Sequence, residues 1–469
     1  MMKLNQRLQA LALCALAATA PSASAQTVTE LVSFDGNSAA GPKTPMTQGF
    51  DGGLYGTTYY GGTGTCFDEQ GIGCGIVFKI TRNGGFKVIY NFQKTGLVYP
   101  INDLVLGGDG NFYGTTTNQA IFKITPQGDL TTVHVFTGGT DGAGLTGGLI
   151  QGTDGSFYGT TYYGGTPSEF CPSGCGTVFK MTPAGAVTTI YSFCPQNYCP
   201  DGENAFGPLV LGGDGNFYGT TENGGLYKHG TAFKISPNGT FTLLYAFKTT
   251  DGGSPYPGGL ALATDGNFYG TNGGSIYRIT PAGVFTQLSE LAGGSNPNLP
   301  IQGTDANLYG TTQVGGGDNL GLIFKLPTDG TASLLHYFAG YPSDGGQPFS
   351  SLVQATDGVF YGTTFTGGSS PCNYYNAPGC GTIFSLDMGL EPFVSFVRHA
   401  QKVGQNFGIL GQGFTGTTSV SLNGTPASFT VKSDTYLVAT VPVGAKTGYV
   451  TVTTPGGALT SNVPFYVIR

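Results

Sequence analysis

The same ten residues, GGDGNFYGTT, occur twice in this chain, at residues 107–116 and 212–221. The core of the phrase, Tyr-Gly-Thr, occurs seven times at intervals of 40 to 60 residues. Its tyrosines are Tyr55, Tyr113, Tyr158, Tyr218, Tyr269, Tyr309 and Tyr361. Repeats of this length are typical of propellers and arrays, whereas the rungs of a β-helix are shorter. One structural unit used seven times is therefore the strongest constraint on the fold.

Each unit contains four short segments with the composition of β-strands. In the fourth unit they read PLVLG, NFYGTT, GTAFKI and TLLYAF. An Asp-Gly turn joins the first two segments and a Pro-x-Gly turn joins the last two, and both are tight-turn sequences. Four-stranded units at this interval predict the blades of a β-propeller. We therefore predict an all-β chain with a seven-bladed β-propeller over residues 26–390.

The aspartate of the phrase also recurs in every unit. The seven residues are Asp51, Asp109, Asp154, Asp214, Asp265, Asp305 and Asp357. Because every unit requires it, we interpret this aspartate as a turn residue and not as a catalytic group. The last unit lacks a clear fourth strand, while ELVSFDG at residues 30–36 matches one. We therefore expect residues 31–34 to pair with residues 381–386 and to complete the seventh blade.

The first 25 residues have the features of a secretory signal. A basic start with Lys3 and Arg7 precedes the apolar run LQALALCALAATA, and Ala-Ser-Ala at residues 23–25 fits a cleavage site. Without them the chain carries 26 acidic and 19 − 2 = 17 basic residues and no basic stripe, which argues against nucleic acid or an anionic membrane as partner. No later segment is apolar enough to be a transmembrane segment. We expect an exported protein that is secreted, periplasmic or associated with the cell surface.

From residue 391 to residue 469 the repeat gives way to a different pattern. Period-two alternation with an Asn423-Gly424 turn predicts an immunoglobulin-like β-sandwich. The segments ILGQGFTGTTSVSLNG and VKSDTYLVATVPVGAKTGYVTVTTPGG resemble an IPT/TIG domain. The repeat unit resembles the GloVer (Gloeo/Verruco) tandem repeat of bacterial "choice-of-anchor" exported proteins. That resemblance implies export and often a surface anchor, for which this sequence shows no pattern, and it implies no reaction.

Eight cysteines follow the signal segment, and an even number in an exported chain predicts disulfide bonds. They lie in local pairs within loops: Cys66 with Cys74, Cys171 with Cys175, Cys194 with Cys199, and Cys372 with Cys380. The alternative is a metal site formed by the four cysteines between residues 171 and 199. We favour disulfides, because the other two pairs are separate and export favours oxidation. We expect no metal and no cofactor.

The variable loops are the expected place of function. In a propeller, the loops after the second and fourth strands share one face, and the tight turns share the other. The first face carries three aromatic pairs that we predict to bind the ligand: Tyr59 and Tyr60, Tyr162 and Tyr163, Tyr374 and Tyr375. Exposed tyrosines suit a glycan or another extracellular protein, although at least one of each pair is expected to pack. The disulfide-clipped loops of the first and seventh units are the favoured site.

Two functions fit the sequence. The first is an exported binding, adhesion or scaffold protein whose ligand binds the disulfide-clipped loop face. The second is a carbohydrate-active enzyme, a polysaccharide lyase or hydrolase, built on a propeller. No established catalytic motif is present, and we assign no catalytic residue. Candidates for acid–base chemistry are the carboxylates outside the repeat pattern: Asp68, Glu69, Glu169, Glu203 and Glu222.

Overall fold

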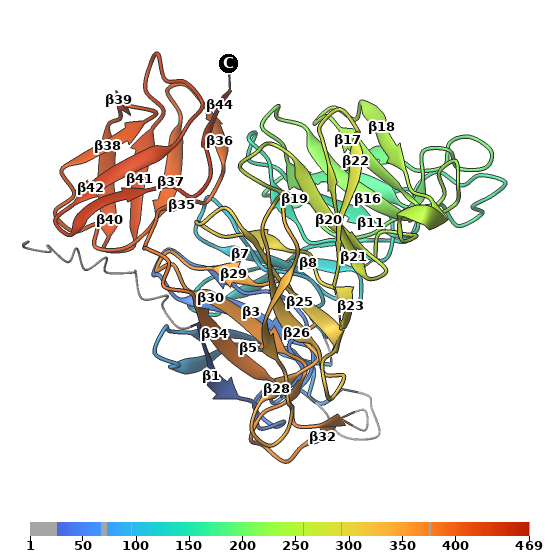
Figure 1. The fold of residues 1–469 in the computed structure, drawn as a ribbon. Helices are drawn as coiled ribbons and strands as arrows, with labels where there is room; N and C mark the ends of the chain where they lie inside the picture. The colour runs from blue at the N-terminus through green and yellow to red at the C-terminus, as the bar shows by residue number, and fades with distance from the viewer. Residues whose placement is uncertain are drawn as a thin grey trace, which may run out of the picture.

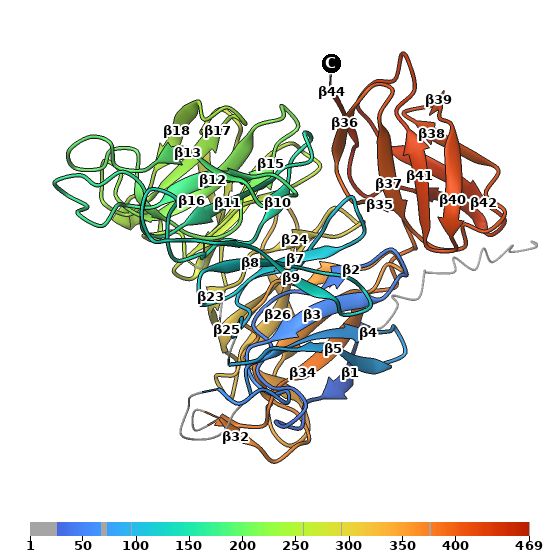
Figure 2. The same cartoon turned by 180° about the vertical axis from the view of Figure 1, so that it is seen from behind.

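The structure, a computed structural model, describes residues 26–66, 73–94, 96–256, 258–291, 293–374 and 377–468. The predicted signal segment lies outside these residues. Within them the chain consists of β-strands and a single 3-10 turn, η1 (Thr249–Asp251), so the all-β prediction is confirmed (Figure 1, Figure 2). Over the same residues there is no helix with the length and apolarity needed to cross a bilayer.

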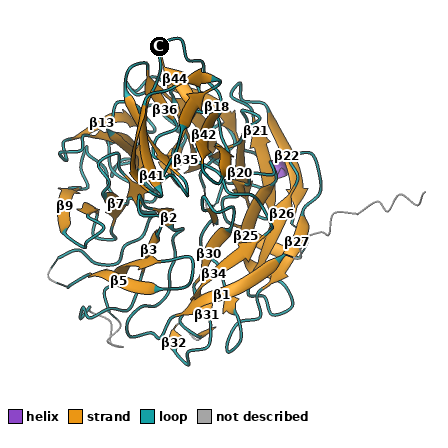
Figure 3. Cartoon of the chain, turned by 90° about the vertical axis from the view of Figure 1, so that its left-hand side faces the viewer, coloured by secondary structure: helices purple, strands orange, loops and turns teal. Residues whose placement is uncertain are grey.

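Seven antiparallel sheets follow one plan, in which a short first strand is followed by three longer strands. The first three sheets contain, in order, β2 (Thr47–Gln48), β3 (Leu54–Thr58), β4 (Ile76–Ile80) and β5 (Phe86–Asn91); β6 (Val105–Leu106), β7 (Phe112–Thr115), β8 (Ala120–Ile124) and β9 (Leu130–Val135); and β10 (Ile150–Gln151), β11 (Phe157–Thr161), β12 (Thr177–Met181) and β13 (Val187–Ser192). In Figure 3 the sheets lie around a common centre.

The fourth and sixth sheets carry one additional strand each, which pairs with the second strand of the unit, the first of its three long strands. The fourth to sixth sheets contain β14 (Glu203–Ala205), β15 (Val210–Leu211), β16 (Phe217–Asn223), β17 (Thr231–Ile235) and β18 (Phe241–Ala246); β19 (Ala261–Leu262), β20 (Phe268–Asn272), β21 (Ser275–Ile279) and β22 (Phe285–Glu290); and β23 (Gly294–Pro297), β24 (Ile301–Gln302), β25 (Leu308–Gly315), β26 (Leu322–Leu326) and β27 (Ser333–Tyr337).

The seventh sheet takes its outer strand from the other end of the chain. Its strands are β29 (Val353–Gln354), β30 (Phe360–Thr364), β34 (Thr382–Asp387) and β1 (Thr27–Ser33). β1 is antiparallel to β34, with Val32 opposite Ile383 and Ser33 opposite Thr382. The expected pairing of the N-terminal strand with the last unit is confirmed. Two short hairpins lie in the loops of this region: β28 (Gly345–Gly346) with β31 (Thr366–Gly367), and β32 (Asn373–Tyr374) with β33 (Ala377–Pro378).

The repeated phrase encodes a turn and the strand that follows it. In all seven sheets the tyrosine hydroxyl donates a hydrogen bond of 2.8–3.0 Å to the turn aspartate. In the fourth sheet Tyr218 donates to Asp214, whose other oxygen accepts the backbone N–H of Asn216. Gly219 follows, and a Cβ there would lie 2.8 Å from the ring of Phe233 on the next strand. The aspartates are therefore turn residues, as the sequence predicts.

Neighbouring sheets pack through the aromatic residues of the same phrase. Tyr218 of the fourth sheet contacts Phe268 of the fifth, with ring centroids 4.1 Å apart. Equivalent pairs join four other junctions at 4.1–4.3 Å. Between the seventh and first sheets, Tyr361 and Leu54 share one buried cluster with Phe34, which follows β1. Burying each such ring contributes roughly 1.5–3 kcal/mol, so the junctions are a main source of stability.

The C-terminal residues form two sheets that pack on a common core. One sheet contains β35 (Ser395–Phe396), β37 (Asn406–Leu410), β41 (Tyr436–Thr440) and β40 (Phe429–Ser433), and the other contains β39 (Thr425–Pro426), β38 (Ser419–Leu422), β42 (Val450–Thr454) and β43 (Gly457–Thr460). β36 (Ala400–Lys402) and β44 (Tyr466–Ile468) pair in parallel beside them. Ile409 and Leu437 from one sheet meet Val420 and Val452 from the other in a single buried cluster. We call this part the sandwich.

The sandwich packs on the ends of the repeat sheets that carry the Asp-Gly turns (Figure 1). We call these ends the turn face and the opposite ends the loop face. Tyr436 of the sandwich stacks on Phe50 of the first turn, with ring centroids 3.8 Å apart and 6° between the ring planes. Arg82 and Gln412 form a hydrogen bond across the same contact. Much of the turn face is thus covered by protein.

Candidate functional site

A cavity of about 610 Å³ lies where the first strands of the repeat sheets converge. Its wall includes residues of β2, β6, β10, β15, β24 and β29. At the turn face, residues 395–399 of the sandwich lie across the cavity. At the loop face, the wall is made by residues that precede the first strands, such as Thr146 and Phe206. The cavity is therefore closed by the sandwich at one end and faces the variable loops at the other.

One position of the repeat fastens neighbouring sheets around this cavity. Asn102 donates from Nδ2 to Thr115 at 2.7 Å and to the carbonyl of Leu145 in the next unit at 2.9 Å. Asn298 of the sixth unit makes the equivalent bonds to Thr311 and to the carbonyl of Pro348, both at 2.8 Å. These amides are already satisfied within the wall. They hold the shape of the cavity and have little capacity left for a ligand.

The next residue of the repeat lines the cavity in six of the seven units, and there the units differ. The seven residues are Pro45, Asp103, Gly148, Pro208, Gly259, Leu299 and Ser351. Asp103 is the one ionisable residue among them, and within the described residues no other side chain donates a hydrogen bond or forms an ion pair with its carboxylate. Burial raises the pKa of Asp103 to about 6. A carboxylate without a side-chain partner in a largely apolar wall is costly to the fold.

Lys43 is a second departure from the repeat at the mouth of the cavity. Its equivalents in four other units are Ile101, Thr146, Phe206 and Phe349. The Lys43 ammonium lies 4.2 Å from the ring centroid of Tyr59, and within the described residues it forms no ion pair with a carboxylate. Burial lowers the pKa of Lys43. The cavity thus holds an acid and a base from two neighbouring units.

The sandwich contributes the other two ionisable groups of the wall, Arg398 and His399. Arg398 donates from Nε to Oε1 of Gln151 at 3.0 Å and so ties the sandwich to the third sheet. Part of the surface of His399 is exposed. The protein atoms around its ring nevertheless lower its pKa, because burial disfavours the charged imidazolium. An imidazole with a lowered pKa and a carboxyl with a raised pKa therefore line one cavity.

The tyrosines predicted to bind the ligand differ in their exposure. Tyr60 is only 4% exposed and lies in a core cluster, so its prediction as a ligand-binding residue is corrected by its burial. Tyr59 is partly buried and stacks on Tyr99, with centroids 4.9 Å apart. Tyr162 donates to Glu222 at 2.9 Å, while Tyr163 is 53% exposed. Tyr374 belongs to β32, but its side chain is not described, and Tyr375 lies outside the described residues.

An exposed aromatic surface continues outward from the cavity over the third and fourth units. Phe206 of the wall contacts Tyr162 on one side and Tyr256 on the other, with centroids 6.1 and 5.3 Å away. Farther out, Phe170 and Tyr198 pack against each other at 4.9 Å. Tyr198 is 68% exposed, although a ring of this size is usually buried. Among the described side chains, exposed aromatic residues thus occur on the third and fourth units and, at Tyr337 and Tyr341, on the sixth, whereas the sequence favoured the first and seventh.

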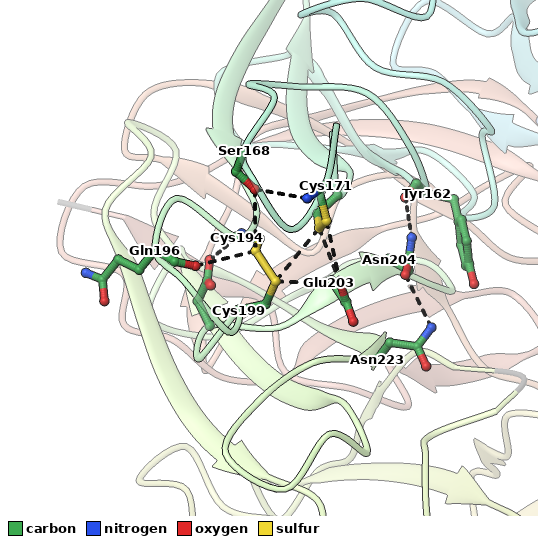
Figure 4. Close-up of a disulfide and its surroundings, with 11 residues drawn as sticks. Tyr162, Ser168, Cys171, Cys194, Gln196, Cys199, Glu203, Asn204 and Asn223 are labelled. Atoms are coloured by element: carbon green, nitrogen blue, oxygen red, sulfur yellow. Dashed lines mark hydrogen bonds between the residues drawn. A yellow bond between two sulfur atoms is a disulfide. The ribbon is translucent and has the colours of Figure 1, made fainter. Parts of the chain in front are cut away.

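Disulfide bonds join the four predicted pairs, Cys66–Cys74, Cys171–Cys175, Cys194–Cys199 and Cys372–Cys380. The two pairs of the third unit are not independent, because their four sulfur atoms lie within 4.8 Å of one another. Figure 4 shows Cys171, Cys194 and Cys199 together with Glu203, which lies at the start of β14. The sequence predicts two local pairs in different loops, and the structure brings both pairs into one cluster.

Comparison with known proteins identifies the repeat. A sequence profile of the Gloeobacter/Verrucomicrobia repeat matches residues 64–273 and 271–413. The chain belongs to this family. No match was found among curated protein sequences.

Solved structures resemble this Gloeobacter/Verrucomicrobia repeat protein in fold. A streptogramin B lyase is 15% identical with a TM-score of 0.52, covering 77% of this chain and 97% of the lyase. A virginiamycin B lyase from Staphylococcus aureus, solved with quinupristin, is 16% identical with a TM-score of 0.51, covering 77% and 99%. A fungal alcohol oxidase in complex with copper is 13% identical with a TM-score of 0.52, covering 94% and 99%. At these identities the likeness concerns the fold alone, and it supports a β-propeller.

Asp103, Lys43 and the exposed surface around Tyr198 were not predicted from the sequence. The first two carry a readable signal, because each breaks a pattern that the other units obey. The carboxylates expected to carry acid–base chemistry lie outside the repeat pattern, whereas Asp103 lies two residues before β6. The position of Tyr198 has no such signal, because it depends on how two loops fold against each other.

Proposed function

We propose that this repeat protein is an exported sugar-binding protein whose ligand enters the central cavity from the loop face. Its seven sheets are the blades of one ring closed by β1, and its sandwich is of the IPT/TIG type and serves as the base of the site. Export is supported by the signal-like first 25 residues and by the four disulfides. The ring is supported by the pairing of β1 with β34 and by the repeated aromatic junctions.

The break in the repeat at Asp103 and Lys43 carries the proposal. Six of the seven units place a residue without charge at each of these two positions. Burying a carboxylate and an ammonium without an ionic partner lowers stability, so the demands of the fold alone do not explain charges at these two positions. Groups that are costly to the fold and lie together in a cavity are typical of binding and catalytic sites.

A saccharide matches the chemistry of this wall. Sugar hydroxyls both donate and accept hydrogen bonds, so they can bond the Asp103 carboxylate and the Lys43 ammonium at once. The apolar face of a sugar ring packs on an aromatic ring, which the mouth offers in Phe206. The exposed rings of Tyr163 and Tyr198 extend this surface beyond the cavity. An oligosaccharide with one residue in the mouth and others on the third and fourth blades fits both features.

A carbohydrate-active enzyme is the second candidate, and the observation that favours it is the pair Asp103 and His399. With a pKa of about 6, Asp103 exchanges its proton near neutral pH, and the neutral ring of His399 can accept one. Proton transfer between these groups and a bound sugar would support a lyase or a hydrolase. Binding requires only the hydrogen-bonding capacity of the same residues, so it is the simpler proposal.

A glycan array combined with a reducing-sugar assay on the same panel tests the proposal. We expect the mature protein to bind a restricted set of saccharides, and Asp103→Ala to reduce that binding at least tenfold. The matched control is Asp318→Ala, which removes an exposed aspartate from a loop of the sixth unit. Turnover of a bound saccharide would favour the enzyme. No binding to any saccharide, or equal binding by Asp103→Ala, would refute the proposed site.

A further inference from the structure

We propose that the four cysteines of the third unit bind one soft divalent cation, such as Zn²⁺, when their disulfides are reduced. The residues are Cys171, Cys175, Cys194 and Cys199, with Glu203 beside them. The site is separate from the central cavity, and its function does not depend on sugar binding.

The positions of the sulfur atoms fit a tetrahedral thiolate site. All four lie within 4.8 Å of one another, and Sγ of Cys175 and Sγ of Cys199 are 4.0 Å apart. Tetrahedral Zn²⁺ with sulfur at about 2.3 Å places its ligands about 3.8 Å from each other. The four cysteines therefore need only small movements once the two sulfur–sulfur bonds are broken. Cys175, Cys194 and Cys199 are buried, which would shield the cation from water.

Separate elements bring these cysteines together. Cys171 and Cys175 lie in the loop before β12, and Cys194 and Cys199 lie in the loop after β13. Because β12 and β13 are neighbours in one antiparallel sheet, the end of one strand lies beside the start of the other. The sheet thus holds the two loops beside each other, so the four sulfur atoms are kept close by the sheet as well as by the disulfides.

Glu203 lies in contact with three of the same sulfur atoms. Its Oε2 atom lies 3.6 Å from Sγ of Cys171, 3.4 Å from Sγ of Cys175 and 3.6 Å from Sγ of Cys199 (Figure 4). A disulfide sulfur has no hydrogen to donate, so in the oxidised protein all of these atoms are acceptors. Glu203 therefore places a further potential oxygen ligand beside the sulfur atoms.

The chemistry is a balanced exchange. A dithiol reductant gives two electrons and two protons to each disulfide and becomes a disulfide itself, so two equivalents produce four thiols. Binding of Zn²⁺ then releases the thiol protons to water, and four thiolates coordinate the cation. Oxidation reverses the exchange and expels the cation. The compartment decides which form is present, because reducing conditions favour thiols and oxidising conditions favour disulfides.

The other two disulfides provide an internal control. Cys66–Cys74 and Cys372–Cys380 belong to different units, and the third-unit quartet is the one potential metal-binding group found within the described residues. We call the variant that keeps the quartet and replaces the other four cysteines by Ser the quartet protein. The variant that keeps Cys66, Cys74, Cys372 and Cys380 and replaces the quartet is the pair protein.

The test is a titration of both mature proteins with Zn²⁺ against a chromophoric chelator, after reduction with a phosphine and under argon. We expect one equivalent of Zn²⁺ per chain for the reduced quartet protein and none for the reduced pair protein or for the oxidised quartet protein. Co²⁺ should give the absorption of a tetrahedral thiolate complex with the quartet protein only. Circular dichroism in each state shows whether the β-structure is kept.

A second variant tests whether a failure to bind Zn²⁺ could reflect loss of structure and not loss of ligands. Cys194→Ser with Cys199→Ser leaves two thiolates in the loop before β12, and we expect the affinity for Zn²⁺ to fall at least 100-fold. Equal affinity of this variant and the quartet protein would overturn the proposal. Equal binding by the quartet and pair proteins, or no binding by a folded, reduced quartet protein, would overturn it as well.

Discussion

Replacement of Asp103 by Asn removes a carboxylate from the cavity with almost no change in volume. In the folded protein burial raises the pKa of this carboxyl from its ordinary value of 3.8 to about 6. The folded state therefore binds the proton more tightly than the unfolded state does. The protonated Asp103 carboxyl makes its full contribution to stability below about pH 4, and this contribution is lost as the pH rises through about 6.

The size of the effect follows from the shift. About two pKa units at roughly 1.4 kcal/mol each set an upper limit of about 3 kcal/mol for the cost of the charged carboxylate at neutral pH. Water in the cavity solvates part of the group, so we expect about 1–2 kcal/mol. Asp103→Asn should therefore be more stable than the parent protein at neutral pH and close to it near pH 4. Lys43 and His399 line the same cavity and titrate in both proteins, so their contributions largely cancel in the difference.

The assay is equilibrium denaturation with guanidinium chloride at several pH values between 4 and 8, with the disulfides intact. Asp318→Asn is the control, because its side chain is exposed and loses no hydration on folding. A stability difference between Asp103→Asn and the parent that does not change with pH would refute the reasoning. It would mean that the carboxylate is fully solvated or that it has a partner.

Three further perturbations test other parts of the account. Phe34→Ala removes a ring that is 2% exposed at the junction of the seventh and first sheets, and we expect a loss of about 3–5 kcal/mol in chemical denaturation; a loss below about 1 kcal/mol would show that the junction is not closed. Tyr269→Phe removes one of the seven turn hydrogen bonds and should cost about 1 kcal/mol, and no change in melting temperature would argue that the bond contributes nothing. Tyr163→Ala and Tyr198→Ala should each weaken glycan binding about 5- to 30-fold with little change in stability, whereas Tyr337→Ala, an equally exposed ring on β27, should not; equal binding by all three would place the ligand elsewhere.

The repeated structure was predictable because each unit encodes its own turn. The bond from Tyr218 to Asp214 spans four residues, so the phrase alone determines it. The pairing of β1 with β34 was predictable for a related reason. The last unit lacks its fourth strand, and the other end of the chain has an unpaired copy of that strand. Only one arrangement, the pairing of β1 with β34, leaves neither edge open.

The exposure of the tyrosines depends on contacts between units and was not predictable from the local sequence. Tyr60 and Tyr163 occupy the same place in the same words, YYGG, yet they are 4% and 53% exposed. Tyr60 is buried in one cluster with Phe365 of the preceding sheet in the ring. The unit that precedes Tyr163 has Thr117 at the position of Phe365 and offers no ring. Burial here is decided by a residue far away in the sequence.

The cavity depends on two further facts that no single unit contains. The wall is built from one or a few residues of each sheet, so its composition becomes visible only when the units are aligned by position. The closure of one end depends on where the sandwich packs, and Arg398 and Phe50 take part in that contact through partners in other parts of the chain. When the seven units are aligned, Asp103 and Lys43 are the only charged residues at their two positions. The same alignment can be made for any repeat sequence.

The position of a bound saccharide tests the central claim most directly. A crystal structure of the mature protein with the glycan that binds best on the array should show a sugar ring in the mouth of the cavity, with a hydroxyl within hydrogen-bonding distance of Asp103. Further sugar residues should lie toward Tyr163 and Tyr198. A saccharide bound on the sandwich, or on the loops of the first and seventh units away from Asp103, would contradict the account.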